Sequence, residues 1–384
     1  MESINALTKN CTGCGSCTVS CPKQCITMES DGEGFRYPLI DEKECIHCRR
    51  CEIVCPVLNR LKDSVETQCF AAQNTDENIR AKSSSGGVFS ALANYVFKEN
   101  GLVCGAAYDE QFAVVHCFVH NEHELEGVRG AKYSQSIAEN CFPQIKDSLE
   151  LGKIVLFVGT PCQVAGLKNY LGTDYPHLIL VDIICHGVPS PKVWEKYLAD
   201  RIKKDARNSR LSFVNLRNKN SGWSRYTYSV EIKYEDNRSY LAPQGMDPFM
   251  RGFTQNLYLR PSCSSCFFKG IERCSDFTLG DYWGVWEQCP DFDDNKGTSL
   301  VMVHTEKGLR LWERIREELR VLDLEGIDCL ANNPSALMSS DEHKNRSRFF
   351  EKMDNVSDFS AHIEKCLTYE RVSVLQRIKN WMTD

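Results

Sequence analysis

Eight cysteines near the start of the chain form two runs with the same spacing. The first run is Cys11, Cys14, Cys17 and Cys21, the second is Cys45, Cys48, Cys51 and Cys55, and a proline follows each run. Three thiolates at this spacing can hold one face of an iron–sulfur cubane, while the fourth reaches a neighbouring cubane. We therefore expect crossed ligation of two [4Fe–4S] clusters, one by Cys11, Cys14, Cys17 and Cys55, the other by Cys45, Cys48, Cys51 and Cys21.

The alternative metal for these runs is zinc, because cysteine pairs separated by two residues also form tetrahedral zinc sites. Zinc modules do not usually carry three cysteines at this spacing, followed by a fourth cysteine and a proline, twice in one chain. The same run is typical of bacterial ferredoxins, which favours iron. Cys25 follows the first run at a position where a small apolar residue is usual. We interpret Cys25 as a packing residue rather than as a ninth ligand.

Four further cysteines can form a third site. Cys263 and Cys266 are separated by two residues in a loop, and Cys162 and Cys185 each follow a short apolar segment. Together they supply four thiolates, and we prefer a third [4Fe–4S] cluster as their use. Two alternatives stay open. Cys274 can substitute for one ligand, and Cys162 and Cys185 can be buried thiols that pack like small hydrophobic side chains.

Strand–loop–helix units position Cys162 and Cys185. Residues 154–158 are an apolar strand followed by a Gly-Thr-Pro turn and a helix, and "HLILVDIICHGVPSPKVWEKYL" repeats this design. Such units indicate an α/β domain whose ligands lie at the carboxyl ends of the strands. The alternation in "RYTYSVEIKY" predicts an antiparallel strand, so we expect a mixed sheet. A nucleophilic pair of Cys185 and His186 is disfavoured, because neighbours on an extended chain point in opposite directions.

The segment "SSSGGVFSALANYVFKENG" predicts a helix. Serines stand at its start as caps, apolar residues recur at helical spacing from Val88 to Val96, and Gly101 lies just beyond its end. Backbone N–H groups at residues 83–87, together with the helix dipole, would favour a phosphate. The alternative is a well-capped amphipathic helix that binds no ligand.

Composition limits the class of protein. The 384 residues are 42% hydrophobic, enough for about two to three globular domains. The 46 Lys and Arg against 52 Asp and Glu give a net charge of −6 with no basic block, which argues against a nucleic-acid partner. The chain lacks an apolar run of the about eighteen residues that a membrane span needs, and it lacks a secretory signal. We therefore expect a cytoplasmic protein, in which metal ligation explains a large part of the 21 cysteines.

Taken together, the motifs resemble the beta-subunit family of coenzyme F420-reducing hydrogenases and dehydrogenases, including its bacterial ferredoxin-fused members and the related plant 7-hydroxymethyl chlorophyll a reductase. The matching stretches are "SSGGVFSAL", "RGAKYSQS", "GTPCQVAGLKNYL", "CHGVPSPKVWEKYL", "RPSCSSC" and "SDFTLGDYWG". They lie within residues 65–290. The resemblance implies a core domain that binds FAD and a [4Fe–4S] cluster, and it favours the third cluster at the four cysteines named above.

Carried over residue by residue, the resemblance places FAD near Ser84, Ser85, Gly86, Gly87, Lys132, Tyr133 and Ser136. His186 and Asp281 are candidate catalytic residues by their positions in the matching motifs. A flavin can exchange electron pairs with an organic molecule and single electrons with clusters, so it suits such a chain. The resemblance further implies coenzyme F420 or another small organic molecule as substrate, ferredoxin or another redox protein as electron carrier, and partner subunits.

We expect four segments: a two-cluster ferredoxin-type domain at residues 1–62, two parts of a mixed-sheet FAD and iron–sulfur domain at 63–150 and 151–335, and a helical tail at 336–384. The favoured function is an FAD and iron–sulfur oxidoreductase, because the flavin-type segments are intact. A second hypothesis is an electron-transfer subunit without a substrate site of its own. A third is a metal-stabilised scaffold that binds no flavin.

Overall fold

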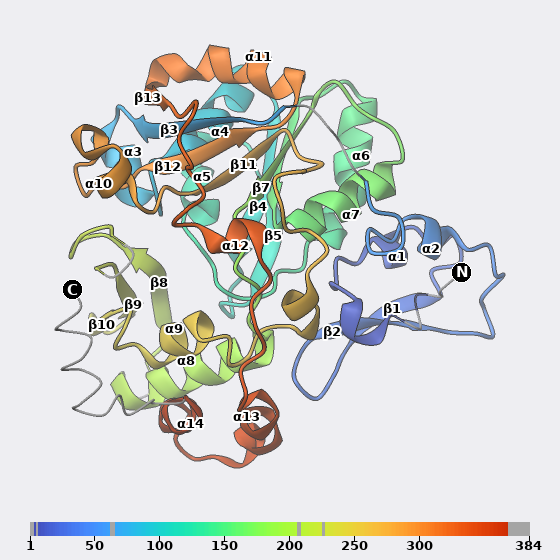
Figure 1. Ribbon diagram of the computed structural model, residues 1–384. Helices are drawn as coiled ribbons and strands as arrows, with labels where there is room; N and C mark the ends of the chain where they lie inside the picture. The colour runs from blue at the N-terminus through green and yellow to red at the C-terminus, as the bar shows by residue number, and fades with distance from the viewer. Residues whose placement is uncertain (1–3, 5–6, 62–65, 206–208, 225–226, 368–384) are drawn as a thin grey trace.

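An eight-stranded mixed sheet forms the centre of the protein. The computed structural model describes residues 4, 7–61, 66–205, 209–224 and 227–367. The strand order is β13-β3-β12-β11-β7-β6-β4-β5, and Figure 1 shows this sheet in the upper half of the molecule. The strands are β3 (Gln68–Asn74), β4 (Leu102–Tyr108), β5 (Val114–Val119), β6 (Val155–Gly159), β7 (Leu178–Ile183), β11 (Phe277–Asp281), β12 (Ser299–Val303) and β13 (Leu319–Asp323).

The four neighbouring strands β4, β6, β7 and β11 run parallel to one another. The outer strands β5, β12 and β13 are antiparallel to their neighbours, so the sheet is mixed, as the sequence predicts. Helix α7 (Pro161–Leu171) directly follows β6, and α8 (Pro191–Asp205) follows the loop after β7. These are the predicted strand–loop–helix units. Because the four strands are parallel, the loops that carry Cys162 and Cys185 begin at the same edge of the sheet.

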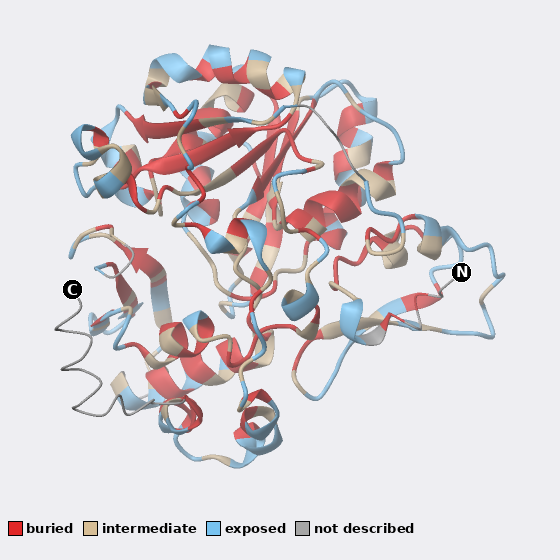
Figure 2. Ribbon diagram, viewed as in Figure 1, coloured by how far each residue is buried: buried red, intermediate tan, exposed pale blue. Residues whose placement is uncertain are grey.

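Helices cover both faces of the sheet, because successive strand residues point to opposite sides. Leu156 and Val181 belong to the core under α4 (Val88–Lys98), α5 (Glu122–Val128) and α11 (Glu306–Ile315). Val155 and Phe157 belong to the core under α6 (Phe142–Glu150) and α7 on the opposite face. Figure 2 shows the strands between these helices as almost continuously buried, which is expected for parallel strands covered on both faces.

A second, three-stranded antiparallel sheet lies below the first in Figure 1. It consists of β8 (Leu211–Asn218), β9 (Ser229–Tyr234) and β10 (Ser239–Pro243). Helices α8, α9 (Pro248–Thr254), α13 (Arg346–Lys352) and α14 (Phe359–Cys366) share its aromatic core. The predicted antiparallel strand in "RYTYSVEIKY" is β9, but it pairs with β8 and β10 rather than with the main sheet. Of the predicted helical tail, residues 368–384 lie outside the described residues.

The N-terminal segment, residues 7–61, lies beside the main sheet (Figure 1). It contains the hairpin β1 (Ile26–Ser30) and β2 (Arg36–Ile40) and the one-turn helices α1 (Ser16–Val19) and α2 (Arg50–Ile53). Helix α1 packs against α6 and α7, so the segment contacts the sheet domain on the side of the Cys162 helix. Short helices α3 (Glu77–Lys82), α10 (Val285–Gln288) and α12 (Pro334–Leu337) complete the fold. Within the described ranges, every helix is too short or too polar to cross a membrane.

Candidate metal centres and cofactor site

The first cysteine group consists of Cys11, Cys14, Cys17 and Cys55. Burial raises the pKa of Cys17 well above its usual range, and the neighbouring thiols of Cys14, Cys11 and Cys55 raise it further. Burial also raises the pKa of Cys55 to about 11, with added repulsion from Cys14 and Cys11. The fold therefore brings together the four thiols that crossed ligation requires, from two runs about thirty residues apart in the sequence. Four thiolates in such a place need a cationic partner, and the iron of a cubane fits this requirement.

The second cysteine group lines a cavity of about 340 Å³ in the outer part of the N-terminal segment. Its thiols come from Cys21 of the first run and from Cys45, Cys48 and Cys51 of the second run. Cys48 is exposed, whereas the other three are half-buried. Cys25 lines the same cavity, and its Sγ lies 3.4 Å from the Sγ of Cys21. The donor set of this cavity is thus rich enough in thiols for a cubane.

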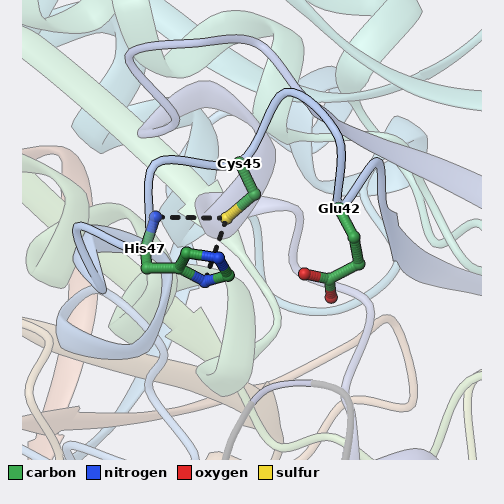
Figure 3. A group of neighbouring side chains, drawn as sticks. All are labelled: Glu42, Cys45 and His47. Carbon is green, nitrogen blue, oxygen red and sulfur yellow. Dashed lines mark hydrogen bonds between the residues drawn. The ribbon is translucent and has the colours of Figure 1, made fainter.

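A histidine and a glutamate flank this second group at the surface. Figure 3 shows His47 and Glu42 on either side of Cys45, and ligand atoms of the three residues lie within 4.8 Å of one another. The backbone N–H of His47 donates to the Cys45 Sγ at 3.4 Å, and its Nδ1 lies 3.9 Å from that sulfur. Such contacts orient a thiolate ligand and tune its electron density. Since Cys45 belongs to the cysteine run, we interpret the trio as surroundings of the second group rather than as a separate metal site.

The third cysteine group surrounds a cavity of about 480 Å³ at the edge of the main sheet. Its thiols are Cys162 at the start of α7, Cys185 after β7, and Cys263 and Cys266 in and just after a short 3-10 helix (Pro261–Ser265). Burial raises the pKa of Cys162 well above its usual range and the pKa of Cys263 to about 12. Cys274, the predicted substitute ligand, is not part of this lining and packs against the core under α6 and α7.

Cations adjoin the third group, and they were missed by sequence reasoning. Burial raises the pKa of Cys185, and the Lys269 ammonium counteracts this rise. Lys269 donates to the Cys185 carbonyl, and it lines the cavity together with Arg260 and Arg273. Positive side chains beside four buried thiols stabilise the thiolate state that iron ligation uses. The signal available in the sequence was weak, since isolated lysines and arginines are usually solvated surface residues.

The first and third groups are neighbours. The thiol of Cys14 is among the groups that raise the pKa of Cys162, and Thr12 lines the third cavity. A Cβ added to Gly166, on α7, would lie 3.0 Å from the Cys14 Sγ and 2.6 Å from the Ser16 Oγ. Only a residue without a side chain allows α7 to approach the first group this closely. The second group, by contrast, faces outward from the hairpin side of the segment.

The two candidate catalytic residues lie in different surroundings. His186 lines the third cavity, where its ring nitrogens contact the Asn256 Oδ1 at 2.6 Å and the Ser335 Oγ at 3.2 Å. Asp281 lies at the end of β11 and forms an ion pair with Arg217, with 2.9 Å between the Asp281 Oδ2 and the Arg217 Nη2. The Asp281 Oδ1 is buried without a hydrogen-bond partner among the described residues. His186 is thus associated with the third cysteine group, and Asp281 with a buried arginine.

The glycine–serine segment before α4 is already engaged with the protein. Gly87 is the N-cap of α4 with φ 90°, where the sequence predicted a serine cap. The Gly86 N–H donates to the Ser299 Oγ at 2.9 Å, and the Ser85 hydroxyl donates to the Thr298 carbonyl. A Cβ on Gly86 would lie 2.1 Å from the Ala72 carbonyl oxygen. Gly86 therefore permits close packing against β3 and β12, and its N–H is not free to bind a phosphate.

The second part of the predicted flavin set lies in the loop after α5. Lys132 donates to the carbonyls of Arg129 and Gly130, and burial lowers its pKa to about 7. Its ammonium lies 5.9 Å from the ring centre of Tyr108 at the end of β4. The Arg129 Nη2 and the Tyr108 hydroxyl are buried without hydrogen-bond partners among the described residues. Two cations and an unpaired hydroxyl fit an anionic, polar ligand such as a flavin nucleotide.

The remaining two residues of the flavin set are held by neighbours. The Tyr133 ring stacks on Phe253 with 4.6 Å between ring centres. The Ser136 hydroxyl accepts a hydrogen bond from the Gln163 Nε2, and the Ser84 Oγ accepts one from the Ala131 N–H. These contacts connect the loop to the starts of α4 and α7. The set predicted from sequence is thus connected in space, although the two cavities described above do not include it.

Comparison with known sequences defines the class first. Residues 10–59 match the "4Fe-4S dicluster domain", so this segment of the chain is an iron–sulfur domain. Residues 69–140 match "Coenzyme F420 hydrogenase/dehydrogenase, beta subunit N-term", and residues 152–328 match the C-terminal half of that same beta subunit. The chain therefore belongs to the coenzyme F420 hydrogenase/dehydrogenase beta-subunit family, a family of oxidoreductases, as its motifs suggest.

Two curated relatives are similar to part of this chain. The coenzyme F420-dependent sulfite reductase of Methanocaldococcus jannaschii is 30% identical over 168 residues, which cover 41% of this chain and 25% of that protein. One of the subunits of the F(420)H(2) dehydrogenase of Methanosarcina mazei is 25% identical over 165 residues, which cover 40% and 46%. The matched regions thus span less than half the length of either relative.

Among solved structures, a chain of the F420-reducing [NiFe] hydrogenase complex from Methanosarcina barkeri matches with a TM-score of 0.45 and 16% identity. The match covers 78% of this chain and 95% of that chain.

Proposed function

We propose that the chain is an iron–sulfur flavoprotein oxidoreductase that passes electrons between a ferredoxin-like carrier and FAD, and from FAD to coenzyme F420 or another two-electron organic substrate. The single observation that carries this proposal is the arrangement of the twelve cysteines. They form three separate groups of four thiols, and the first group adjoins both the second run and the third cavity. We infer one [4Fe–4S] cluster in each group.

The exposure of the groups supports an order of electron transfer. Cys48 of the second group is exposed, so this group is accessible to an external carrier. The first group is more buried and lies against α7, which carries Cys162 of the third group. An electron that enters the chain at Cys48 thus has a continuous series of thiol sites toward the edge of the main sheet.

We further propose that the loop at residues 129–136 and the start of α4 hold FAD through Ser84, Ser85, Gly86, Gly87, Lys132, Tyr133 and Ser136. The unpartnered Arg129 and Tyr108 atoms beside Lys132, in the part of the chain that the structure describes, support this placement. Because Gly86 already donates to Ser299, we assign it a packing role in this site and give the anion-binding role to Lys132 and Arg129. A flavin supplies the conversion between single electrons and electron pairs.

A second candidate function is an electron-transfer subunit that lacks a substrate site and serves a larger complex. The observation in its favour is that one relative is named as part of a multi-subunit dehydrogenase and is matched over only part of its length. In this case, His186 and Asp281 have structural roles, which agrees with their hydrogen bonds to Asn256 and Ser335 and with the ion pair to Arg217. We retain the cytoplasm as the expected location and 1–62, 63–150, 151–335 and 336–384 as the expected segments.

Anaerobic purification followed by iron and flavin analysis tests the proposal. We expect about twelve iron atoms per chain, four for each of three clusters, and one FAD. About eight irons without flavin would refute the third cluster and the flavin site. Stopped-flow reduction of the isolated chain by reduced F420, compared with reduced ferredoxin, then separates the two functions. Reduction by ferredoxin alone, with no response to F420 or other organic hydride donors until a partner subunit is added, would favour the electron-transfer subunit.

A further inference from the structure

We propose that Cys25 is a fifth thiol of the second cysteine cavity and replaces Cys21 as the iron ligand when Cys21 is lost. The inference rests on the proposed binding of a [4Fe–4S] cluster by the second group. A cubane takes four cysteines, yet the thiols of Cys21, Cys25, Cys45, Cys48 and Cys51 all line this cavity. The sequence interpretation of Cys25 as a packing residue alone does not account for this position.

The backbone between Cys21 and Cys25 holds the two thiols together. The Gln24 N–H donates to the Cys21 carbonyl at 3.1 Å, which closes a turn. Gln24 itself has φ 53°, a left-handed conformation that is uncommon for a residue other than glycine. The turn brings the Cys25 Sγ to 3.4 Å from the Cys21 Sγ.

The hairpin fixes the Cys25 side of this contact. The Cys25 carbonyl accepts a hydrogen bond from the Asp41 N–H at 2.8 Å, and β1 begins at the next residue. Cys25 is 8% exposed, so its thiol is held in the interior beside the cavity rather than in solvent. A ligand at either sulfur can therefore be exchanged for the other by a small side-chain movement, without refolding of the segment.

The chain contains an internal comparison for this arrangement. Cys55 is the fourth cysteine of the second run, as Cys21 is of the first run, and Asn59 occupies the position that corresponds to Cys25. Asn59 is exposed, and its side-chain amide donates to the Glu52 carbonyl at 2.6 Å. The first group thus lacks a fifth thiol at the corresponding place.

The exchange is a substitution of ligands and moves no electrons. The bond between iron and the Cys21 sulfur breaks, and the Cys25 thiol loses its proton. The Cys25 thiolate forms the new bond to the same iron, and the proton goes to the departing Cys21 thiolate or, where Cys21 is absent, to solvent. The charge and the oxidation state of the cluster stay the same.

The test is an iron count on the full chain, purified anaerobically, for the parent and its variants. We expect the parent, Cys21→Ala and Cys25→Ala to hold about twelve irons. We expect Cys21→Ala/Cys25→Ala to lose about four, and Cys55→Ala to lose about four as well, because Asn59 cannot replace a thiolate. Cys21→Ala/Cys25→Ser, which keeps the size of the side chain, should match the double alanine variant and so separate ligation from packing.

The outcomes distinguish this inference from the proposed function. A parent with about four irons or fewer refutes the clusters themselves. A complete parent together with loss of about four irons from Cys21→Ala overturns only the role of Cys25. Loss of iron from Cys25→Ala alone also overturns it, because Cys25 would then be required while Cys21 is present. An EPR spectrum of reduced Cys21→Ala that differs from the parent, at an unchanged iron count, is the expected sign of the new ligand.

Discussion

Replacement of Arg260 by methionine is expected to loosen the N-terminal segment from the sheet domain without unfolding either. Arg260 is 1% exposed and contacts both parts. Its Nε donates to the Cys11 carbonyl at 2.7 Å, its Nη2 to the Arg36 carbonyl at 2.9 Å, and its Nη1 to the Gln135 Oε1 at 2.9 Å. The guanidinium also lies 4.3 Å from the ring centre of Tyr37.

The size of the effect follows from these contacts. A hydrogen bond from a charged group contributes about 1.5–3 kcal/mol, so three such bonds have a nominal sum of about 4.5–9 kcal/mol. Removal of the cation also removes the cost of its burial, and methionine fills part of the space. We therefore expect the contact to weaken by about 3–5 kcal/mol, the range for loss of one partner from a buried ionic network. This corresponds to at least a hundredfold increase in the open population.

Hydrogen exchange measures this opening. The peptide over residues 11–19 contains Ser16, which is completely buried, and α1 packs on α7. Its amides should exchange faster in Arg260→Met, while those of α4, in the separate core of the main sheet, should not change. Arg260→Lys keeps the charge but loses the planar fork of donors, so it should give an intermediate rate. Equal exchange of the 11–19 peptide in Arg260→Met and parent, at equal iron content, would refute the reasoning.

Three further predictions follow from the site. Cys162→Ser should lose about four irons and keep the other eight, and loss of all iron would contradict a separate third cluster. Gly166→Ala should weaken the contact of α7 with the first group by about 1–3 kcal/mol, seen as faster exchange of residues 11–19, because its Cβ would overlap Ser16 and Cys14. Gly105→Ala is the control, since its Cβ would lie 3.5 Å from Val128, and an equal effect in both variants would contradict the assignment. The lowered pKa of Lys132, about 7 in the folded state against an ordinary 10.5, means that the unfolded chain binds more protons between these values, so stability rises with pH from about 7 toward 10.5. In flavin-free protein the free energy of unfolding should rise by about 1–2 kcal/mol from pH 7 to 9, allowing for partial exposure of the side chain, and a Lys132→Met variant that showed the same rise in urea titrations would exclude this lysine as the source.

The sequence predicted the parts of the molecule that depend on local spacing. The two cysteine runs, the strand before Cys162 and the helix after Gly87 are all set by residues within about twenty positions of one another. The mixed sheet followed from the same local patterns. Gly86 shows the limit of this reasoning. Its glycine-rich context predicts an exposed helix start, but the N–H partner, Ser299, lies 213 residues away on β12.

Long-range packing decided what the sequence could not show. Arg260 directly precedes Pro261 and the Cys263 pair, which marks it as close to a metal site but not as a contact to Cys11 and Arg36. The assignment of β9 to a second sheet likewise depends on which partners close the ladder, and alternation alone does not specify them. The proximity of Cys25 to Cys21 needed the turn geometry at Gln24, which is unusual for that residue.

The composition of the N-terminal core ties iron to folding. Its buried hydrophobic members are Ile4, Leu7, Cys25, Ile26 and Cys55, and most of the partly buried side chains packed against them are cysteines of the two runs. A segment of about fifty residues rarely buries enough apolar surface to fold alone. Here the ligand thiols occupy the positions where aliphatic side chains would stand, and their deprotonated form is unstable without a cation. The binding free energy of the metal is therefore also folding free energy for this segment, whereas the main sheet has an aliphatic core of its own and does not depend on iron in this way.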